Sequence, residues 1–373
     1  MKKFLVDIIL YAIPVFIISG IIGIFYGVGY YSGEFADIDK SIESQRADHS
    51  ILIGHGYNEQ IVYYKLQNAN YYQADIIVLG SSRALTFRGT YFKESFYNCG
   101  LGLVQGWDYN GYRNFLQNLT YTPDTIILDL DSYVFNDAYN KYCVEYNEFT
   151  QIQKIDRNVL AMMKDMIADY LHGKWTWSSL SNYADNIGFK GKINDNGFMY
   201  DGSRYYGDKY RYPDYMFVNA KDTISRGAGH FSYGEHIDQD ILVQLDNLLA
   251  YCAKNDIYVI AYEAPFPPSI YKEMENSGNY GYLAEVAPAC ETELEKYDFE
   301  FYDYADVTRL GVTDDFFYDG NHGGEVAYGY IIQDMIENGS KIADYIDIDK
   351  LNFLIDNAYN ELTFENPDTR TIN

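Results

Sequence analysis

The sequence predicts an α/β fold: a three-layer α/β/α domain with a parallel sheet, preceded by one N-terminal transmembrane helix. Three observations predict it. The chain begins with a long apolar segment, four short apolar runs follow at wide intervals, and helical patterns separate those runs. Strands that alternate with helices form parallel sheets whose two faces the helices cover. The 373 residues, 47% of them hydrophobic, suffice for one large domain or two smaller ones.

The apolar segment at residues 8–28 has the length of a membrane anchor. A helix of 21 residues spans about 30 Å, the thickness of a bilayer core. Lys2 and Lys3 precede it, so the positive-inside tendency places the N-terminus in the cytoplasm and the rest of the chain outside. A cleaved signal peptide is the rival interpretation, but its apolar region is shorter and ends in an A-x-A-like site, which G-V-G at 27–29 matches poorly. We therefore expect an uncleaved, single-pass anchor in the cell membrane with an extracytoplasmic domain.

The four apolar runs predict buried parallel strands. They cover residues 76–79, 125–135, 257–267 and 299–306. An apolar run closed by glycine and small polar residues is typical of a parallel strand whose carboxyl end meets a functional loop. Helical patterns between and after these runs cover residues 110–118, 239–254 and 325–338.

These elements divide the chain into four segments. We expect an anchor with a cytoplasmic stub at 1–31, a polar lead-in at 32–70, an α/β domain at 71–340 and a C-terminal extension at 341–373. Residues 140–235 interrupt the alternation, with one amphipathic helix near 152–171 and then a tract rich in Gly, Tyr, Asn and Asp. An insertion of this size usually serves substrate access or a partner.

Composition excludes some partners and leaves others open. The net charge of -26 excludes nucleic acid and argues against docking to a polyanionic surface without metal ions or a partner protein. The 41 tyrosines suit sugar-like or amphipathic ligands, but codon bias in an AT-rich genome is the preferred explanation of their number. The cysteines lack C-x-x-C spacing, which argues against a zinc site and leaves both disulfides and buried free thiols open. They are Cys99, Cys143, Cys252 and Cys290.

A serine motif follows the first predicted strand. The tetrapeptide Gly80-Ser81-Ser82-Arg83 lies beyond the carboxyl end of that strand, where open parallel sheets bind their ligands. A serine there can face solvent at the start of a helix, but it needs a base within hydrogen-bond reach to act as a nucleophile. An ordinary helix N-cap explains the same residues.

One of the six histidines stands out, because Asp319 precedes His322 by three residues. A single turn can present both side chains in the same direction, so that the carboxylate holds the imidazole tautomer and stabilises the imidazolium. Seen alone, the motif also fits an exposed loop histidine. Together with the upstream serine and the order of the strands, it indicates a catalytic triad of Ser82, Asp319 and His322.

The G-S-S loop and the D-x-x-H motif resemble the first and last blocks of the SGNH/GDSL hydrolase superfamily. The resemblance extends from about residue 75 to 335, with 140–235 as an insertion. The chain is most similar to the extracytoplasmic branch that includes the D-alanyl-transfer protein of teichoic acid modification and the acetyltransferase-like proteins of polysaccharide O-acetylation. The resemblance implies Ser82 as nucleophile, and the N–H groups of Ser82 and Gly102, or Gly100 in its place, as the oxyanion hole.

The third block of the superfamily, G-x-N-D, is absent. Its asparagine completes the oxyanion hole, whereas the second predicted strand here ends D-L-D-S-Y at 129–133. Losing one oxyanion donor lowers the rate by about 10²–10³. Either Arg83 or Tyr133 replaces that donor, or turnover is low or absent. Arg83, Tyr133 and Asp131 are therefore candidates for substrate contacts.

The expected function is ester chemistry outside the cell. The resemblance implies a serine esterase or O-acyltransferase that acts on a cell-envelope glycan or polymer through an acyl-serine intermediate, without a cofactor or a metal. It also implies an acyl donor, a glycan or polymer acceptor, and a multipass membrane O-acyltransferase as partner. One alternative is a catalytically inactive SGNH-fold module that binds a glycan or a partner protein. Another is a magnesium-dependent phosphatase of the haloacid-dehalogenase type, whose D-x-D motif residues 129–131 match, although it has Thr or Val where Tyr133 stands.

Overall fold

The computed structural model describes residues 2–369 apart from 94, 103–108, 141–148 and 156. It divides into two compact units, each built from two segments of the chain. Unit 1 comprises Met1–Gln60 and Lys154–Tyr200, and unit 2 comprises Ile61–Gln153 and Asp201–Asn373. The predicted insertion at 140–235 is therefore shared between the two units. The C-terminal segment at 341–373 belongs to unit 2.

Unit 2 contains a five-stranded parallel sheet in the order β2-β1-β3-β6-β7. The strands are β1 (Ile76–Leu79), β2 (Phe96–Asn98), β3 (Thr125–Leu130), β6 (Tyr258–Glu263) and β7 (Glu300–Asp303). Every residue of β1 and β3 is buried, as expected for strands covered on both faces. The prediction of a mixed α/β fold with a parallel sheet is confirmed.

Four of the five strands coincide with the predicted apolar runs. β2 was missed because it has only three residues and no apolar run around it. The predicted strands at 125–135, 257–267 and 299–306 extend too far, since β3 ends at Leu130, β6 at Glu263 and β7 at Asp303. Beyond Leu130 the chain forms the 3₁₀ turn η3 (Ser132–Phe135), whose apolar residues are buried without being a strand.

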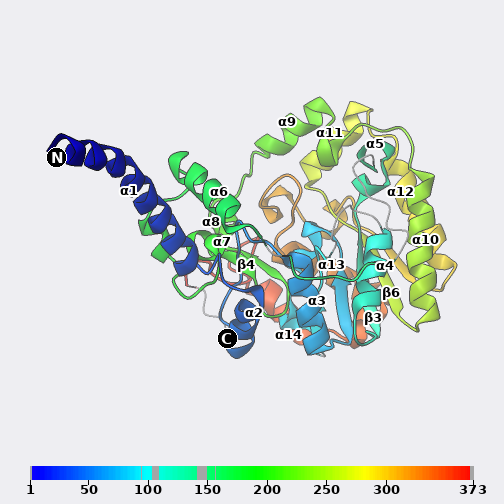
Figure 1. The fold of residues 1–373 in the computed structure, drawn as a ribbon. Coiled ribbons are helices and arrows are strands. Elements are labelled where there is room, and N and C mark those ends of the chain that lie inside the picture. The colour runs from blue at the N-terminus through cyan, green and yellow to red at the C-terminus, as the bar shows by residue number, and fades with distance from the viewer. Residues whose placement is uncertain (1, 94, 103–108, 141–148, 156, 370–373) are drawn as a thin grey trace. The chain divides into compact units, whose positions relative to one another are not determined.

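The strand order reverses at β1, so right-handed crossovers place connections on opposite faces of the sheet. The helices α4 (Tyr109–Asn118), α10 (Gln239–Lys254) and α12 (Leu283–Glu295) pack in one row, and Figure 1 shows α4 beside α10. The helix α13 (Glu325–Glu337) packs with the chain after β1, where the Phe87 ring contacts the rings of Tyr262 and Tyr328.

The remaining elements of unit 2 surround this core. The helices are α3 (Ile61–Tyr72), α5 (Asp137–Asn140), α8 (Gly207–Arg211), α9 (Val218–Arg226), α11 (Pro268–Ser277) and α14 (Ile348–Asp356). The 3₁₀ turns are η1 (Ser82–Thr86), η2 (Gly89–Tyr91), η5 (Gly229–Phe231), η6 (Thr308–Leu310), η7 (Asp314–Phe316) and η8 (Lys341–Asp344), and β5 is Arg204–Tyr206. Figure 1 shows α9 beside α11.

The helix α10 illustrates why the predicted helical boundaries agree with the structure. Its N-cap Asp238 accepts a hydrogen bond from the Asp240 N–H, which satisfies one of the free donors of the first turn. Ile241, Leu245 and Leu248 recur at helical spacing and are buried. Both ends coincide with the prediction of 239–254. The α4 and α13 boundaries lie within one residue of 110–118 and 325–338.

Unit 1 contains the N-terminal helix α1 (Lys2–Tyr31), of which Tyr11–Tyr31 is long and apolar enough to span a membrane. Near the end of α1, Phe25 and Val28 are buried with Met166 and Trp175. The other elements are α2 (Ile38–Ala47), α6 (Val159–Leu171), η4 (Ser178–Ser181), α7 (Phe189–Asn194) and β4 (Asn196–Phe198). The amphipathic helix predicted near 152–171 begins later, at Val159, after its N-cap Asn158.

Three cysteines lie in the described part of the chain. Cys99, Cys252 and Cys290 are buried free thiols, all in unit 2. Burial raises the pKa of Cys99 and of Cys252 to about 12, so both thiols stay protonated at neutral pH. Cys143 lies outside the described residues.

Candidate active site

Ser82 is presented by a tight turn at the carboxyl end of β1. A Cβ at Gly80 would lie 2.5 Å from the Cβ of Asp129, so only glycine allows the turn to pack against β3. The hydroxyl of Ser81 accepts the N–H of Arg83 and thereby caps η1. The N-cap role therefore belongs to Ser81, which leaves the Ser82 hydroxyl to other partners. The helix expected after the serine is the single 3₁₀ turn η1.

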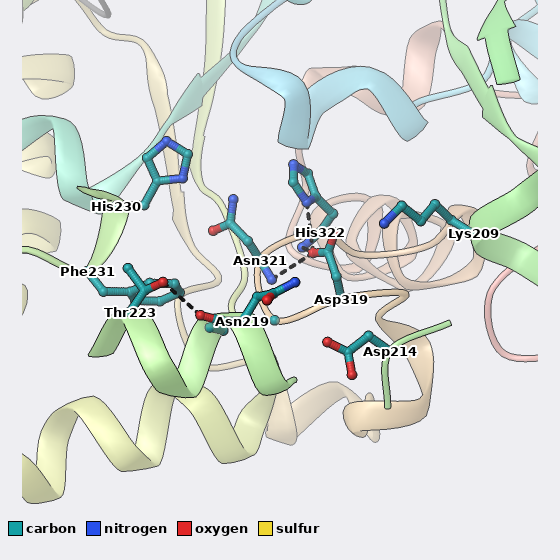
Figure 2. Close-up of a pocket in the computed structure, with 11 residues that line it drawn as sticks. Lys209, Asp214, Asn219, Thr223, His230, Phe231, Asp319, Asn321 and His322 are labelled. Atoms are coloured by element: carbon teal, nitrogen blue, oxygen red, sulfur yellow. Dashed lines mark hydrogen bonds and ion pairs between the residues drawn. The ribbon is translucent and has the colours of Figure 1, made fainter. Parts of the chain in front are cut away.

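Ser82, His322 and Asp319 form a continuous chain of hydrogen bonds. The Oγ of Ser82 lies 2.8 Å from Nε2 of His322, although the two residues are 240 positions apart. On the other side of the ring, Nδ1 of His322 lies 2.8 Å from Oδ1 of Asp319. The three residues predicted as a catalytic triad are thus brought together at hydrogen-bonding distances (the last two are drawn in Figure 2).

The loop that carries Asp319 and His322 is organised by the carboxylate itself. Oδ1 of Asp319 also accepts the backbone N–H groups of Asn321 and His322, each at 3.0 Å. The ring of Tyr318 stacks on the imidazole with a centroid distance of 5.4 Å and an interplanar angle of 6°. A Cβ at Gly320 would lie 2.2 Å from the Cβ of Ala220, so this glycine lets the loop approach α9 closely. These contacts fix the orientation of the ring.

The electrostatics favour an ionised Asp319. Burial by itself would raise the pKa of this carboxyl, but the charge and hydrogen bond of His322 and the N–H of Asn321 outweigh it, so the pKa lies below the ordinary value. An ionised carboxylate beside Nδ1 favours the tautomer that carries its proton there. Nε2 is then free to accept the proton of Ser82, which is the role of a general base.

The two glycines predicted as oxyanion donors are engaged within the chain. The N–H of Gly102 is donated to the carbonyl of Cys99 at 2.9 Å, and that of Gly100 to Oδ1 of Asn98 at 2.9 Å. The amide group of Asn98 in turn donates to the carbonyls of Ala84 and Phe87, which ties this loop to η1. Among the described residues, nothing accepts the N–H of Ser82, which is therefore the donor that remains in this conformation.

Arg83, Asp131 and Tyr133, the candidates for substrate contacts, are 1%, 3% and 1% exposed and bond to one another. Nη1 of Arg83 lies 2.8 Å from Oδ1 of Asp131, and the Tyr133 hydroxyl donates to Oδ2 of the same carboxylate at 2.8 Å. The guanidinium also donates to the carbonyl of Pro265 and lies over the ring of Phe266 at 4.2 Å. Arg83 thus packs against the sheet and supports the turn that carries Ser82.

The two carboxyl groups of the D-x-D motif are buried, and each accepts at least one hydrogen bond from the chain. Oδ2 of Asp129 accepts the N–H of Ser81 at 3.2 Å, and Asp131 holds Arg83. Burial, followed by the charge of Asp131, raises the pKa of Asp129 well above its ordinary value. A buried, protonated carboxyl is a poor ligand for Mg²⁺. Within the described part of the chain, no group of three or more histidine, cysteine or carboxyl side chains is arranged to hold a metal ion.

A cavity of about 260 Å³ opens beside His322, and the Asp319–His322 loop forms one of its walls (Figure 2). Its other polar lining residues include Lys209, Asp214, Asn219, Thr223 and His230. His230 stacks on the ring of Tyr133 at 4.3 Å, and burial lowers its pKa to about 4, so it is neutral at physiological pH.

Sequence reasoning did not select His230 or Asn321. His230 has no local motif, because it reaches the site through the packing of η5. Asn321 was treated as a spacer within D-x-x-H, yet it is only 8% exposed and neither atom of its amide group has a hydrogen-bond partner among the described residues. No sequence pattern signals an unpaired amide of this kind.

Comparisons of the chain with protein-family models, with curated proteins and with solved structures find no match. The geometry of the site and the sequence motifs that converge on it are therefore the basis for a functional assignment. That geometry comprises a serine hydroxyl on a strand-end turn, an imidazole beside it, and a carboxylate that orients the imidazole. A cavity adjoins the imidazole.

Proposed function

We propose that this protein is a membrane-anchored serine esterase or O-acyltransferase of the SGNH type. It acts on a cell-envelope glycan or polymer through an acyl intermediate on Ser82. The observation that supports the proposal most strongly is the hydrogen-bonded series Ser82–His322–Asp319, assembled from distant segments at the carboxyl end of the sheet. Such a series gives a serine hydroxyl the adjacent, oriented base that it needs to become a nucleophile.

In the first step the Ser82 oxygen attacks an ester or thioester carbonyl of the acyl donor. The Oγ–H bond breaks and its proton passes to Nε2 of His322, while the ionised Asp319 stabilises the resulting imidazolium. The N–H of Ser82 stabilises the negative oxygen of the tetrahedral intermediate. When the intermediate collapses, the bond to the leaving oxygen or sulfur breaks, and His322 returns the proton to that leaving group. The acyl group is then esterified to Ser82.

In the second step an acceptor attacks the acyl-serine ester. His322 takes the proton of an acceptor hydroxyl or of water as its oxygen bonds to the acyl carbon. The Ser82 oxygen leaves and recovers its proton from His322. Water as acceptor gives an esterase, and a glycan hydroxyl gives an O-acyltransferase. No metal or cofactor enters either step.

The proposed location is the outer face of the cytoplasmic membrane. The apolar part of α1 supports an anchor, and Lys2 and Lys3 support a cytoplasmic N-terminus. Both units would then lie outside, where a multipass membrane O-acyltransferase could act as the partner that supplies the acyl group. This partner follows from the resemblance to extracytoplasmic acyl-transfer proteins.

A second candidate is an SGNH-fold module that binds a glycan or a partner protein without turnover. Two observations favour it: the third-block asparagine is absent, and the N–H groups of Gly100 and Gly102 are already engaged. An oxyanion hole with a single donor would stabilise the transition state poorly, since each donor is worth about 10²–10³ in rate.

Labelling with a fluorophosphonate probe separates the two candidates, because the probe reacts only with an activated serine. We expect the full-length chain in detergent micelles to be labelled, and Ser82→Ala and His322→Ala to abolish the labelling. Asp319→Asn should slow it on the order of 10⁴-fold, because the asparagine cannot stabilise the imidazolium.

Ser225→Ala, which removes an exposed serine on α9, is the matched control and should be labelled like the wild type. A folded wild-type chain that reacts no faster than Ser82→Ala would contradict the enzymatic proposal and favour the binding module.

A further inference from the structure

The amide of Asn321 is buried beside the cavity without a protein partner. It is 8% exposed, and neither Nδ2 nor Oδ1 makes a hydrogen bond within the described chain. A buried polar group left unpaired costs about 1–3 kcal/mol, so proteins rarely keep one without a function. Figure 2 shows this amide projecting from the Asp319–His322 loop toward His230. It therefore offers one donor group and one acceptor group to a ligand.

The other walls of the cavity are polar but nearly neutral. Asn219 and Thr223 on α9 add an amide and a hydroxyl, and His230 is neutral at physiological pH. Lys209 and Asp214 lie on the side away from His230 in Figure 2, and their opposite charges balance. A ligand that carries several hydroxyl groups matches this lining, since each hydroxyl both donates and accepts. The ionised Asp319 of the loop adds one negative charge to this balanced pair, so the lining disfavours an anionic ligand.

The cavity also adjoins the catalytic base. The His322 imidazole belongs to its wall, and the unpaired amide is on the preceding residue. A hydroxyl compound held by Asn321 therefore lies next to the group that must remove the proton of the attacking oxygen. The net charge of -26 repels a polyanionic acceptor and leaves a neutral one unaffected.

We propose that this cavity is the acceptor site, that it binds one sugar residue of a neutral carbohydrate, and that Asn321 positions the attacking hydroxyl beside His322. The acyl-transfer part of this inference rests on the proposed function, whereas the binding part does not. Asn321 then determines how the acyl-Ser82 ester is divided between transfer to the sugar and hydrolysis. In the transfer step the sugar O–H gives its proton to His322 Nε2, the sugar oxygen bonds to the acyl carbon, and Ser82 leaves with that proton.

Binding is tested first, in a background that cannot turn over. The probe is methyl β-D-glucopyranoside, and saturation-transfer NMR measures its dissociation constant for the full-length Ser82→Ala chain in micelles. We expect a millimolar dissociation constant that rises about tenfold when Asn321→Ala is added. Asn352→Ala, which removes an exposed asparagine on α14, should leave it unchanged. Equal binding by all variants, or no binding by any of them, overturns the proposed acceptor site.

The division of the acyl-Ser82 ester between transfer and hydrolysis is tested next, in a chain that keeps Ser82. The burst of nitrophenol from p-nitrophenyl acetate reports acylation of Ser82, and mass spectrometry of the acetylated methyl glucoside reports transfer. We expect Asn321→Ala to lower the ratio of transfer to hydrolysis about tenfold, with a much smaller effect on the burst. A burst that falls as much as the transfer would make Asn321 an oxyanion donor and overturn its role toward the acceptor.

The two tests separate failure of this inference from failure of the proposed function. A sugar that binds through Asn321 to a chain without any burst leaves the carbohydrate site standing and contradicts the serine chemistry. A burst without sugar binding supports the serine chemistry and contradicts the carbohydrate site. Asn321→Leu provides a check on folding, because no group in the described part of the chain loses a partner when the amide is removed. Its unfolding temperature should equal or exceed that of the wild type, and a marked decrease would show that the amide is structural.

Discussion

Two histidines of unit 2 line one cavity in different electrostatic surroundings. Nδ1 of His322 lies 2.8 Å from the carboxylate of Asp319. His230 packs on Tyr133, where burial disfavours the imidazolium and outweighs the nearby charge of Asp131, which favours it. His230 therefore stays neutral at physiological pH and presents no charge to a ligand in the cavity.

At the residue scale we predict that His230 lowers stability as the pH falls. Its pKa is about 4 in the folded chain and 6.5 ordinarily, so between these values the unfolded chain binds a proton that the folded chain refuses. The stabilisation is present above about pH 6.5 and is lost as the pH falls toward 4. Urea unfolding should show that the free energy of unfolding falls less between pH 7 and pH 4.5 for His230→Phe than for the wild type. The exposed His172→Phe is the control, and a loss as large in His230→Phe as in the wild type would contradict the prediction.

At the scale of elements, the start of α13 connects the His322 loop to the C-terminal segment. Gly324 donates its N–H to the carbonyl of Phe316, and Glu325 donates its N–H to the carbonyl of Leu362. The Glu325 carboxylate is fully buried and pairs with the guanidinium of Arg88 after η1. This ion pair therefore holds the segment after Ser82 against the helix that follows His322.

Removing one partner of that pair should be costly. Glu325→Ala leaves Arg88 buried without its countercharge, and we expect the free energy of unfolding to fall by about 3–5 kcal/mol. The double variant Arg88→Met with Glu325→Leu should recover much of that loss, because no charge remains buried. Glu337→Ala, at the exposed end of α13, should change stability by no more than about 0.5 kcal/mol. Chemical denaturation measures all three, and a double variant no more stable than Glu325→Ala would contradict this explanation.

At the scale of the whole molecule, the surroundings of α1 differ along its length. Its exposed apolar residues suit a membrane, whereas Phe25 and Val28 are 6% and 7% exposed and belong to the core of unit 1. The Phe25 ring contacts Trp175 and Trp177 at centroid distances of 6.0 and 5.8 Å. The end of the helix is therefore part of a folded unit.

This division predicts different outcomes for two N-terminal deletions. Removing residues 1–31 deletes Phe25 and Val28 and should lower the stability of unit 1 by roughly 3–6 kcal/mol, since each buried side chain contributes about 1.5–3 kcal/mol. Removing residues 1–19 keeps both side chains and should leave that stability unchanged. Thermal unfolding in mild detergent, followed by circular dichroism, distinguishes the two. Equal unfolding temperatures would show that the packing of Phe25 and Val28 contributes nothing.

The sequence by itself determined the features that depend on neighbouring residues. Apolar runs and helical periodicity predicted β1, β3, β6, β7 and α10, because hydrophobic burial imposes its spacing locally. The G-S-S and D-x-x-H motifs selected the three side chains that the structure brings within hydrogen-bonding distance. Composition and length identified the apolar part of α1 as a candidate membrane span.

Only the tertiary structure decided the features that depend on contacts between distant segments. It revealed β2, the assembly of each unit from two segments, the burial of Arg83 and the engagement of the Gly100 and Gly102 N–H groups. It also brought His230 to the cavity and left the Asn321 amide without a partner among the described residues. Whether a polar group is satisfied depends on which side chains fold against it, and no local pattern of residues carries that information.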